Sequence, residues 1–88
     1  MANDKHDFAR EWALKWAEGC IIGYIRGTLE ERKAIPMLRK AIEMLSPNEV
    51  KRIIENIWQN PVYLPSLNTG VKKAKAKELL KKLDLVKK

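Results

Sequence analysis

The stretch that most constrains the fold of this chain is residues 7–26, which is apolar over roughly two thirds of a helical circumference. At about 100° per residue, its aromatic residues and Cys20 fall on one side of the helix. A second apolar group continues round the other side. A helix with so wide an apolar surface is either the central helix of a bundle or one that shares an interface with a partner. The second group consists of Leu14, Ala17, Ile21 and Ile25. The two groups leave only a narrow charged arc, which holds Glu11, Lys15 and Glu18.

Glycine recurs every four residues in and just after this stretch, at Gly19, Gly23 and Gly27. Gly27 supplies the left-handed residue that commonly ends a helix. Glycine within a helix costs about 1 kcal/mol relative to alanine, so Gly19 and Gly23 need a packing reason. Two reasons stay open at this point, namely room for a neighbouring side chain in the core and a groove for self-association.

Two capping boxes mark the starts of further helices. Ser46 stands at an N-cap, with Pro47 at the first helical position and Glu49 closing the box, and this pattern predicts a helix to about Gln59. Its apolar residues fall within an arc of roughly 140°, which is typical of a helix that faces a core. The apolar residues are Val50, Ile53, Ile54, Ile57 and Trp58, and the opposite face carries Arg52, Glu55 and Asn56.

The second capping box, from Thr28 to Glu31, predicts a helix that begins there, with the threonine hydroxyl accepting from the Glu31 amide. Pro36 would then lie inside this helix, where it removes a hydrogen bond and clashes with the preceding turn at a cost of about 3 kcal/mol. We therefore expect either a kink at Pro36 or a short helix to about Ala34 followed by a new one.

The last part of the chain combines an apolar loop with a lysine-rich helix. Asn60 and Pro61 end the preceding helix, and residues 62–70 are irregular but apolar, so we expect them to fold back onto the core with Asn68 or Thr69 as the next N-cap. The helix that follows has a stripe of Ala76, Leu79, Leu80 and Leu83 and an opposite row of Lys73, Lys77 and Lys81.

These signals together predict an all-α fold, a compact bundle of about four helices in a single domain, residues 1–88. The first helix should be central, the second kinked or broken at Pro36, and the fourth amphipathic and rich in lysine. A chain of this size buries only about 60 to 65% of the surface that its extended form exposes, so its margin of stability is thin.

The net charge of +7 is concentrated at one end. Residues 72–88 hold eight Lys and two acidic residues, a net charge of +6, whereas residues 1–71 hold ten Lys or Arg and nine acidic residues, a net charge of +1. The single cysteine suits a reducing compartment, and no apolar run approaches the ~20 residues of a membrane span. We therefore expect a cytoplasmic protein without a membrane-spanning segment.

The sequence carries no catalytic or ligand-binding motif. It has no glycine-rich phosphate loop and no paired-cysteine or HExxH spacing, and a single His and a single Cys are too few for a catalytic set. His6 lies beside two aspartates, which we interpret as a solvated cluster and not as a metal site. We expect Cys20 in the core. The chain is therefore predicted to be non-enzymatic, with no cofactor and no metal.

The two tryptophans near the amino terminus also allow two interpretations. Trp12 and Trp16 could stack on nucleic-acid bases, but aromatic residues spaced four apart on a helix more commonly belong to a core, where we expect both.

The lysines of the last helix are the only feature of the sequence that points to a function. Ammonium groups along an exposed helix recruit a phosphate backbone through the release of condensed counterions. Lysine suits positioning more than base reading, so we expect binding to DNA or RNA with low sequence specificity. A solvated helix, an acidic protein partner and an anionic membrane surface are the other readings. The candidate residues are Lys72, Lys73, Lys75, Lys77, Lys81, Lys82, Lys87 and Lys88.

The alternative function is an assembly subunit that uses the two-sided first helix. Three short helices would leave part of the apolar surface of the first helix, an arc of roughly 260°, uncovered. We therefore expect Leu14, Ile21 and Ile25 to lie at an interface with another chain. The partner would be a second copy of the chain, which makes a homo-oligomer, or a larger protein complex.

Overall fold

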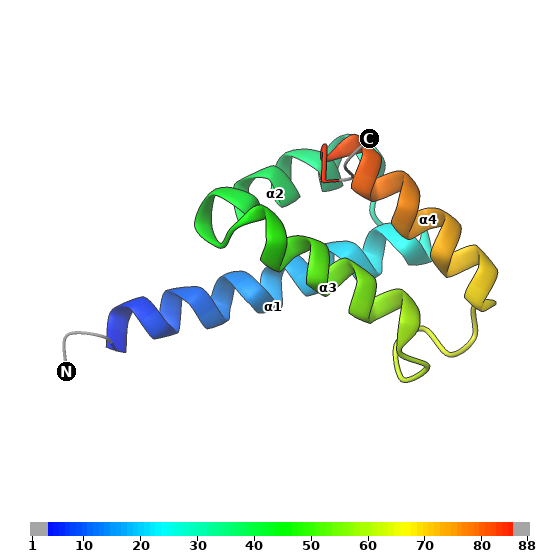
Figure 1. Ribbon diagram of the computed structural model, residues 1–88, viewed down its shortest axis with the longest axis horizontal. Coiled ribbons are helices and arrows are strands. Elements are labelled where there is room, and N and C mark those ends of the chain that lie inside the picture. Colours follow the sequence, from blue (N-terminus) through cyan, green and yellow to red (C-terminus); the bar gives the residue numbers. More distant parts are fainter. Residues whose placement is uncertain (1–3, 86–88) are drawn as a thin grey trace.

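Four helices and no strand make up the described part of the chain, residues 4–85 of a computed structural model (Figure 1). Side chains are described from Phe8 to Leu85. This arrangement confirms the predicted all-α fold of four helices. The helices are α1 (Asp4–Arg26), α2 (Glu31–Met44), α3 (Pro47–Gln59) and α4 (Thr69–Lys82).

The first helix contacts each of the other three helices, as predicted for a central helix, and α3 does so too. Its carboxyl-terminal half contributes to the core, and its amino-terminal half extends beyond the rest of the molecule (Figure 1). The radius of gyration is 13.1 Å, against about 12 Å expected for a compact domain of this length. The projecting end of α1 accounts for this elongated shape, 44 × 29 × 23 Å.

Short-range capping signals fix where α3 and α4 begin. The hydroxyl of Ser46 accepts a hydrogen bond from the Glu49 amide at 3.1 Å, and Pro47 occupies the first helical position. The side chain of Asn68 accepts from the Gly70 amide at 2.7 Å. Both caps are confirmed, and each satisfies a backbone donor that the first turn of a helix leaves without a partner.

The amino end of α2 differs from its prediction. The N-cap residue is Glu30, and no side chain caps the helix, so the Thr28 capping box is wrong. The Thr28 hydroxyl instead donates to the Gly23 carbonyl at 3.4 Å. The reason lies in the end of α1, where Gly27 at φ +92° turns the chain and the amides of residues 27–29 donate back to the same Gly23 carbonyl.

Of the two alternatives predicted at Pro36, a kink or a break, the break is wrong, because α2 is one continuous helix from Glu31 to Met44 with Pro36 inside it. Pro36 is exposed, while Ala34, Leu38 and Ala41 are fully buried on the opposite face. Burial of an apolar face stabilises by about 25 cal/mol per Å², and this term offsets the cost of roughly 3 kcal/mol for an internal proline.

The core-facing pattern of α3 is confirmed. Val50, Ile54 and Ile57 are fully buried, Ile53 and Trp58 are partly buried against them, and Arg52 is exposed. The loop after α3 folds back onto the core, as expected. Leu64 is buried in a left-handed conformation at φ +50°, and the Tyr63 hydroxyl donates to Glu18 of α1 at 2.9 Å.

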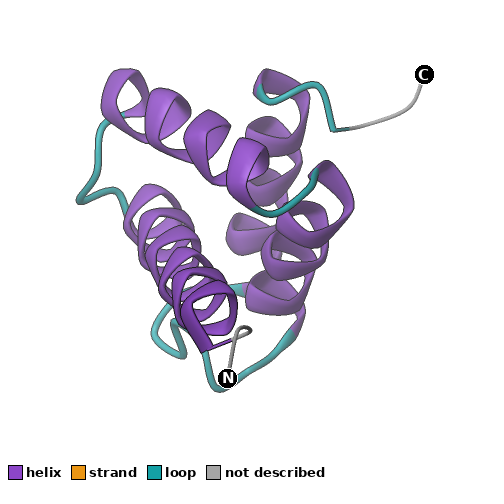
Figure 2. Ribbon diagram, turned by 90° about the vertical axis from the view of Figure 1, so that its left-hand side faces the viewer, coloured by secondary structure: helices purple, strands orange, loops and turns teal. Residues whose placement is uncertain are grey.

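The prediction for the two sides of α1 needs correction. Ile21 and Ile25 are 0% and 2% exposed inside this single chain, so their assignment to an intermolecular interface is wrong, and Leu14 is half-buried. Trp12, expected in the core, is 54% exposed instead. Figure 2 shows the other three helices gathered on one side of α1. Ile21 is buried against them, whereas Phe8 and Trp12 in the amino-terminal half are exposed.

Candidate nucleic-acid interface

The apolar stripe of α4 determines which of its lysines face outward. Ala76, Leu79, Leu80 and Leu83 are all buried, as the sequence pattern predicts. The Tyr24 hydroxyl of α1 donates to the Glu78 carboxylate at 2.6 Å and ties α4 to the central helix. Helix α4 therefore has one fixed orientation, which sets the position of each lysine.

Lys72 does not belong to the interface. It is only 3% exposed, and its Nζ atom donates to the backbone carbonyl of Tyr63 at 3.0 Å. This predicted site residue is therefore wrong. A sequence signal could have excluded it, because Lys72 stands seven residues before Leu79 and so shares the core-facing arc of the helix.

Three more of the predicted lysines have partners within the chain. The ammonium of Lys73 lies 5.7 Å from the centre of the Trp58 ring, and that of Lys75 lies 5.8 Å from the Tyr24 ring. Both are cation–π distances, which leave the charge open to solvent on its other side. Lys82 is half-buried and forms an ion pair with Glu31 of α2.

Lys77 and Lys81 are exposed, and among residues 8–85 no acidic side chain forms an ion pair with either. Together with Lys73 they make the lysine row, defined as Lys73, Lys77 and Lys81. The row spans about 12 Å along the helix at 1.5 Å per residue. Lys87 and Lys88 lie outside the described residues.

The pKa values of both members of the pair that joins α1 to α4, Tyr24 and Glu78, are shifted. The hydrogen bond from Tyr24 is the main cause that lowers the pKa of Glu78, and nearby lysines lower it further. Burial, followed by the same hydrogen bond, raises the pKa of Tyr24 well above its usual range. Glu78 therefore stays ionised near neutral pH and offsets part of the positive charge of α4.

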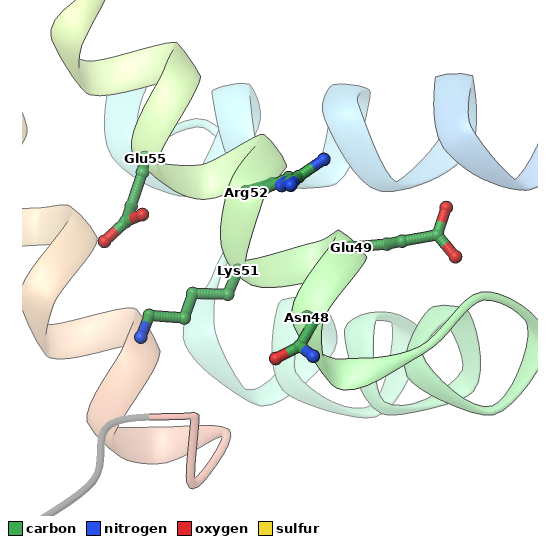
Figure 3. A pocket seen from close by; sticks show the side chains of 5 residues that line it. All are labelled: Asn48, Glu49, Lys51, Arg52 and Glu55. Atoms are coloured by element: carbon green, nitrogen blue, oxygen red, sulfur yellow. The ribbon is translucent and has the colours of Figure 1, made fainter.

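A shallow hollow of about 370 Å³ lies on the outer face of α3 (Figure 3). Lys51 and Arg52 line it together with Glu49 and Glu55, and the Glu49 carboxylate also forms an ion pair with Arg10. The charges of the hollow balance, and its residues all come from one helix. It is therefore a solvated gap between side chains and not a built anion site.

Other chemistry is sparse in the described part of the chain. No group of three or more His, Cys, Asp or Glu side chains among these residues is placed to hold a metal ion. Cys20 is buried, as expected, and burial raises the pKa of its thiol. None of the described helices combines the length and the apolar character needed to cross a membrane. His6 and its neighbouring aspartates have no described side chains.

Comparison with protein-family models, with curated proteins and with solved structures finds no match to this chain.

Proposed function

We propose that this chain is a small non-enzymatic helical protein that binds nucleic acid through phosphate contacts of the lysine row. The observation that carries the proposal is the exposure of Lys77 and Lys81 on a helix whose opposite face is fixed in the core. Lys73 extends the same row beside Trp58. The single buried cysteine suits a reducing compartment, so we propose the cytoplasm as its location.

The physical basis is electrostatic. Three like charges at intervals of four residues repel one another by a few tenths of a kcal/mol per pair, and a phosphate backbone removes that repulsion. Each contact releases a condensed counterion from the nucleic acid. The row holds no Arg, Asn or Gln for base edges, so discrimination between sequences should be small.

The test is a fluorescence-anisotropy titration of labelled duplex DNA and duplex RNA of the same sequence at several salt concentrations. Wild-type affinity should fall with a log–log slope of roughly −3 to −6 against salt. Replacement of Lys73, Lys77 and Lys81 by Gln should remove most of the binding and roughly 3 from that slope.

A matched control separates the row from the overall charge. Replacement of Lys33, Lys40 and Arg52 by Gln removes an equal number of positive charges, but from exposed positions on α2 and α3. This control should keep the wild-type slope within about one. Equal losses in the two triple variants, or no wild-type binding at low salt, would contradict the proposal.

A second candidate function is favoured by a separate observation. Phe8 and Trp12 are 72% and 54% exposed on the open side of α1, and large aromatic side chains left in water commonly mark an interaction site. The chain would then act as an assembly subunit, and such an interface should change little with salt.

A further inference from the structure

The open side of α1 divides into two halves with opposite shapes. The amino-terminal half carries the aromatic ridge, defined as Phe8 and Trp12, whose side chains are mostly in solvent. The Trp12 ring stacks on the half-buried Trp16 ring, with their centres 5.7 Å apart. Trp12 is therefore held in place, and the ridge presents a large apolar surface at the end of α1 that extends beyond the other helices (Figure 1).

The carboxyl-terminal half is hollowed. A groove of about 440 Å³ runs along Gly19 and Gly23 and is bordered by Leu29 and Met37. Gly23 has a reason inside the chain, because a Cβ atom there would lie 3.1 Å from the Cβ of Leu29. Gly19 has none, since a Cβ atom there would meet nothing within 4 Å. Glycine is a poor helix former, so the fold of this chain alone does not explain Gly19.

The ridge and the groove lie on the same face of the helix. At about 100° per residue, Phe8, Trp12, Gly19 and Gly23 fall within an arc of roughly 60°. Within each half the two residues are four apart. A two-fold axis midway between Lys15 and Trp16 would therefore set each ridge residue opposite a glycine of a second copy.

We infer that two copies of this chain pair through antiparallel α1 helices, with the aromatic ridge of each seated in the glycine groove of the other. Trp12 lies over Gly19 of the second copy, and Phe8 lies beside its Gly23. Met37 at the groove border gives the incoming ring a thioether contact. The inference uses residues other than the lysine row and so goes beyond the proposed nucleic-acid function.

The matched spacing of ridge and groove favours a second copy as the occupant, because in this register both aromatic residues of each chain meet a glycine of the other. Charge does not decide the pairing. In the antiparallel register Arg26 stands opposite Lys5 and one residue from Asp4 in the sequence of the other chain. The two helix dipoles also run in opposite directions, and the isologous contact closes at two chains.

The area available indicates a weak dimer. Helix α1 has 23 residues, which at 1.5 Å per residue give a length of about 34 Å. Two such faces bury on the order of 1,000 Å² in total, the lower limit for a specific interface. The pair should therefore form at high micromolar concentration and dissociate on dilution.

The first test is sedimentation velocity from low micromolar to millimolar protein. Wild-type protein should move from monomer to dimer across this range. Gly19→Gln, and separately the double variant Phe8→Ala/Trp12→Ala, should raise the dissociation constant at least about tenfold. The matched control is Val62→Ala, which removes a 77% exposed apolar side chain from the loop after α3 and should change nothing. A wild-type monomer at millimolar concentration would overturn the inference.

A mixing experiment tests the antiparallel arrangement. The double variant lacks the ridge but keeps the groove, and Gly19→Gln lacks the groove but keeps the ridge. An equal mixture should form a heterodimer through the one remaining ridge-and-groove contact, although neither variant dimerises alone. No heterodimer would favour a parallel pair and overturn the arrangement. Circular dichroism of each variant checks that α1 stays folded.

The dimer and the proposed nucleic-acid binding can be tested independently of each other. The triple variant Lys73→Gln, Lys77→Gln and Lys81→Gln should dimerise like wild type, and Gly19→Gln at dilute concentration should keep the wild-type salt slope for duplex binding.

Discussion

The ammonium of Lys72 donates a hydrogen bond to the backbone carbonyl of Tyr63 at 3.0 Å, and only 3% of this lysine is exposed. The bond joins the first turn of α4 to the loop that folds back from α3. Tyr63 in turn donates its hydroxyl to Glu18 of α1. One buried lysine thereby fixes a loop that has little secondary structure of its own.

The first prediction concerns this bond. Lys72→Ala should lower the free energy of unfolding by about 1 to 3 kcal/mol, because it leaves the Tyr63 carbonyl without its donor and removes a packed side chain. Lys77→Ala, at an exposed position of the same helix, should change it by less than about 0.5 kcal/mol. Urea unfolding followed by circular dichroism measures both. Equal effects would mean that Lys72 is solvated in solution.

The second prediction tests the facing of α3. Ile54 is fully buried at the centre of the α3 stripe, so Ile54→Ala should destabilise by about 2 to 5 kcal/mol through loss of burial and the cavity that remains. Arg52 is exposed, and Arg52→Ala should change stability by less than about 0.5 kcal/mol. Two variants with the same melting temperature would show that α3 faces another way.

The elements that could be predicted from sequence are those fixed by partners close in the chain. The cap at Ser46 needs only the amide of Glu49, three residues away, and the cap at Asn68 needs only Gly70. The stripe of α3 is likewise a property of one helix. Such signals survive folding because no distant segment competes for the same groups.

The predictions that failed depend on which distant segment covers a given face. At Pro36 the break was the wrong one of two alternatives, because burial of the opposite face of α2 outweighs the local cost of a proline inside a helix. Ile21, expected at an interface, is buried, and Trp12, expected in the core, is exposed. The reason is that a helix apolar on most of its circumference does not reveal which side three further helices will cover. The candidate site also divides into local and distant effects. The exposure of Lys77 was predictable from the leucine stripe of its own helix, whereas the carbonyl that binds Lys72 belongs to the loop before that helix.

The third prediction concerns acid stability and the pair of Tyr24 and Glu78. The hydrogen bond from Tyr24 lowers the pKa of Glu78 below its usual value of 4.5 in the folded chain. The stability from this bond is therefore present at neutral pH and is lost as pH falls through the lowered pKa. In Tyr24→Phe, unfolding free energy should fall less steeply than in wild type between about pH 5 and 3.

The same pair has an alkaline counterpart. The pKa of Tyr24 is raised above its usual value of 10.0, so its contribution is complete below that value and is lost as pH rises further. Urea titrations across both ranges measure the two slopes. Tyr63→Phe is the control, because it removes the bond to Glu18 and leaves Glu78 unchanged. An acid slope in Tyr24→Phe equal to that of wild type would contradict the role assigned to this bond.

The last prediction sets the stability of the monomer against its assembly. At dilute concentration, Gly19→Ala should raise the free energy of unfolding by up to about 1 kcal/mol, because alanine is the better helix former and its Cβ meets open space. Gly23→Ala should gain less or lose stability, since its Cβ would lie 3.1 Å from Leu29. At high concentration, Gly19→Ala should weaken the dimer, because the added methyl lifts Trp12 of the second copy from the groove. Urea unfolding at dilute concentration and sedimentation at high concentration separate the two effects. A loss of stability in the dilute Gly19→Ala protein would mean that Gly19 serves the fold of the monomer, and its use as a groove residue would then have no basis.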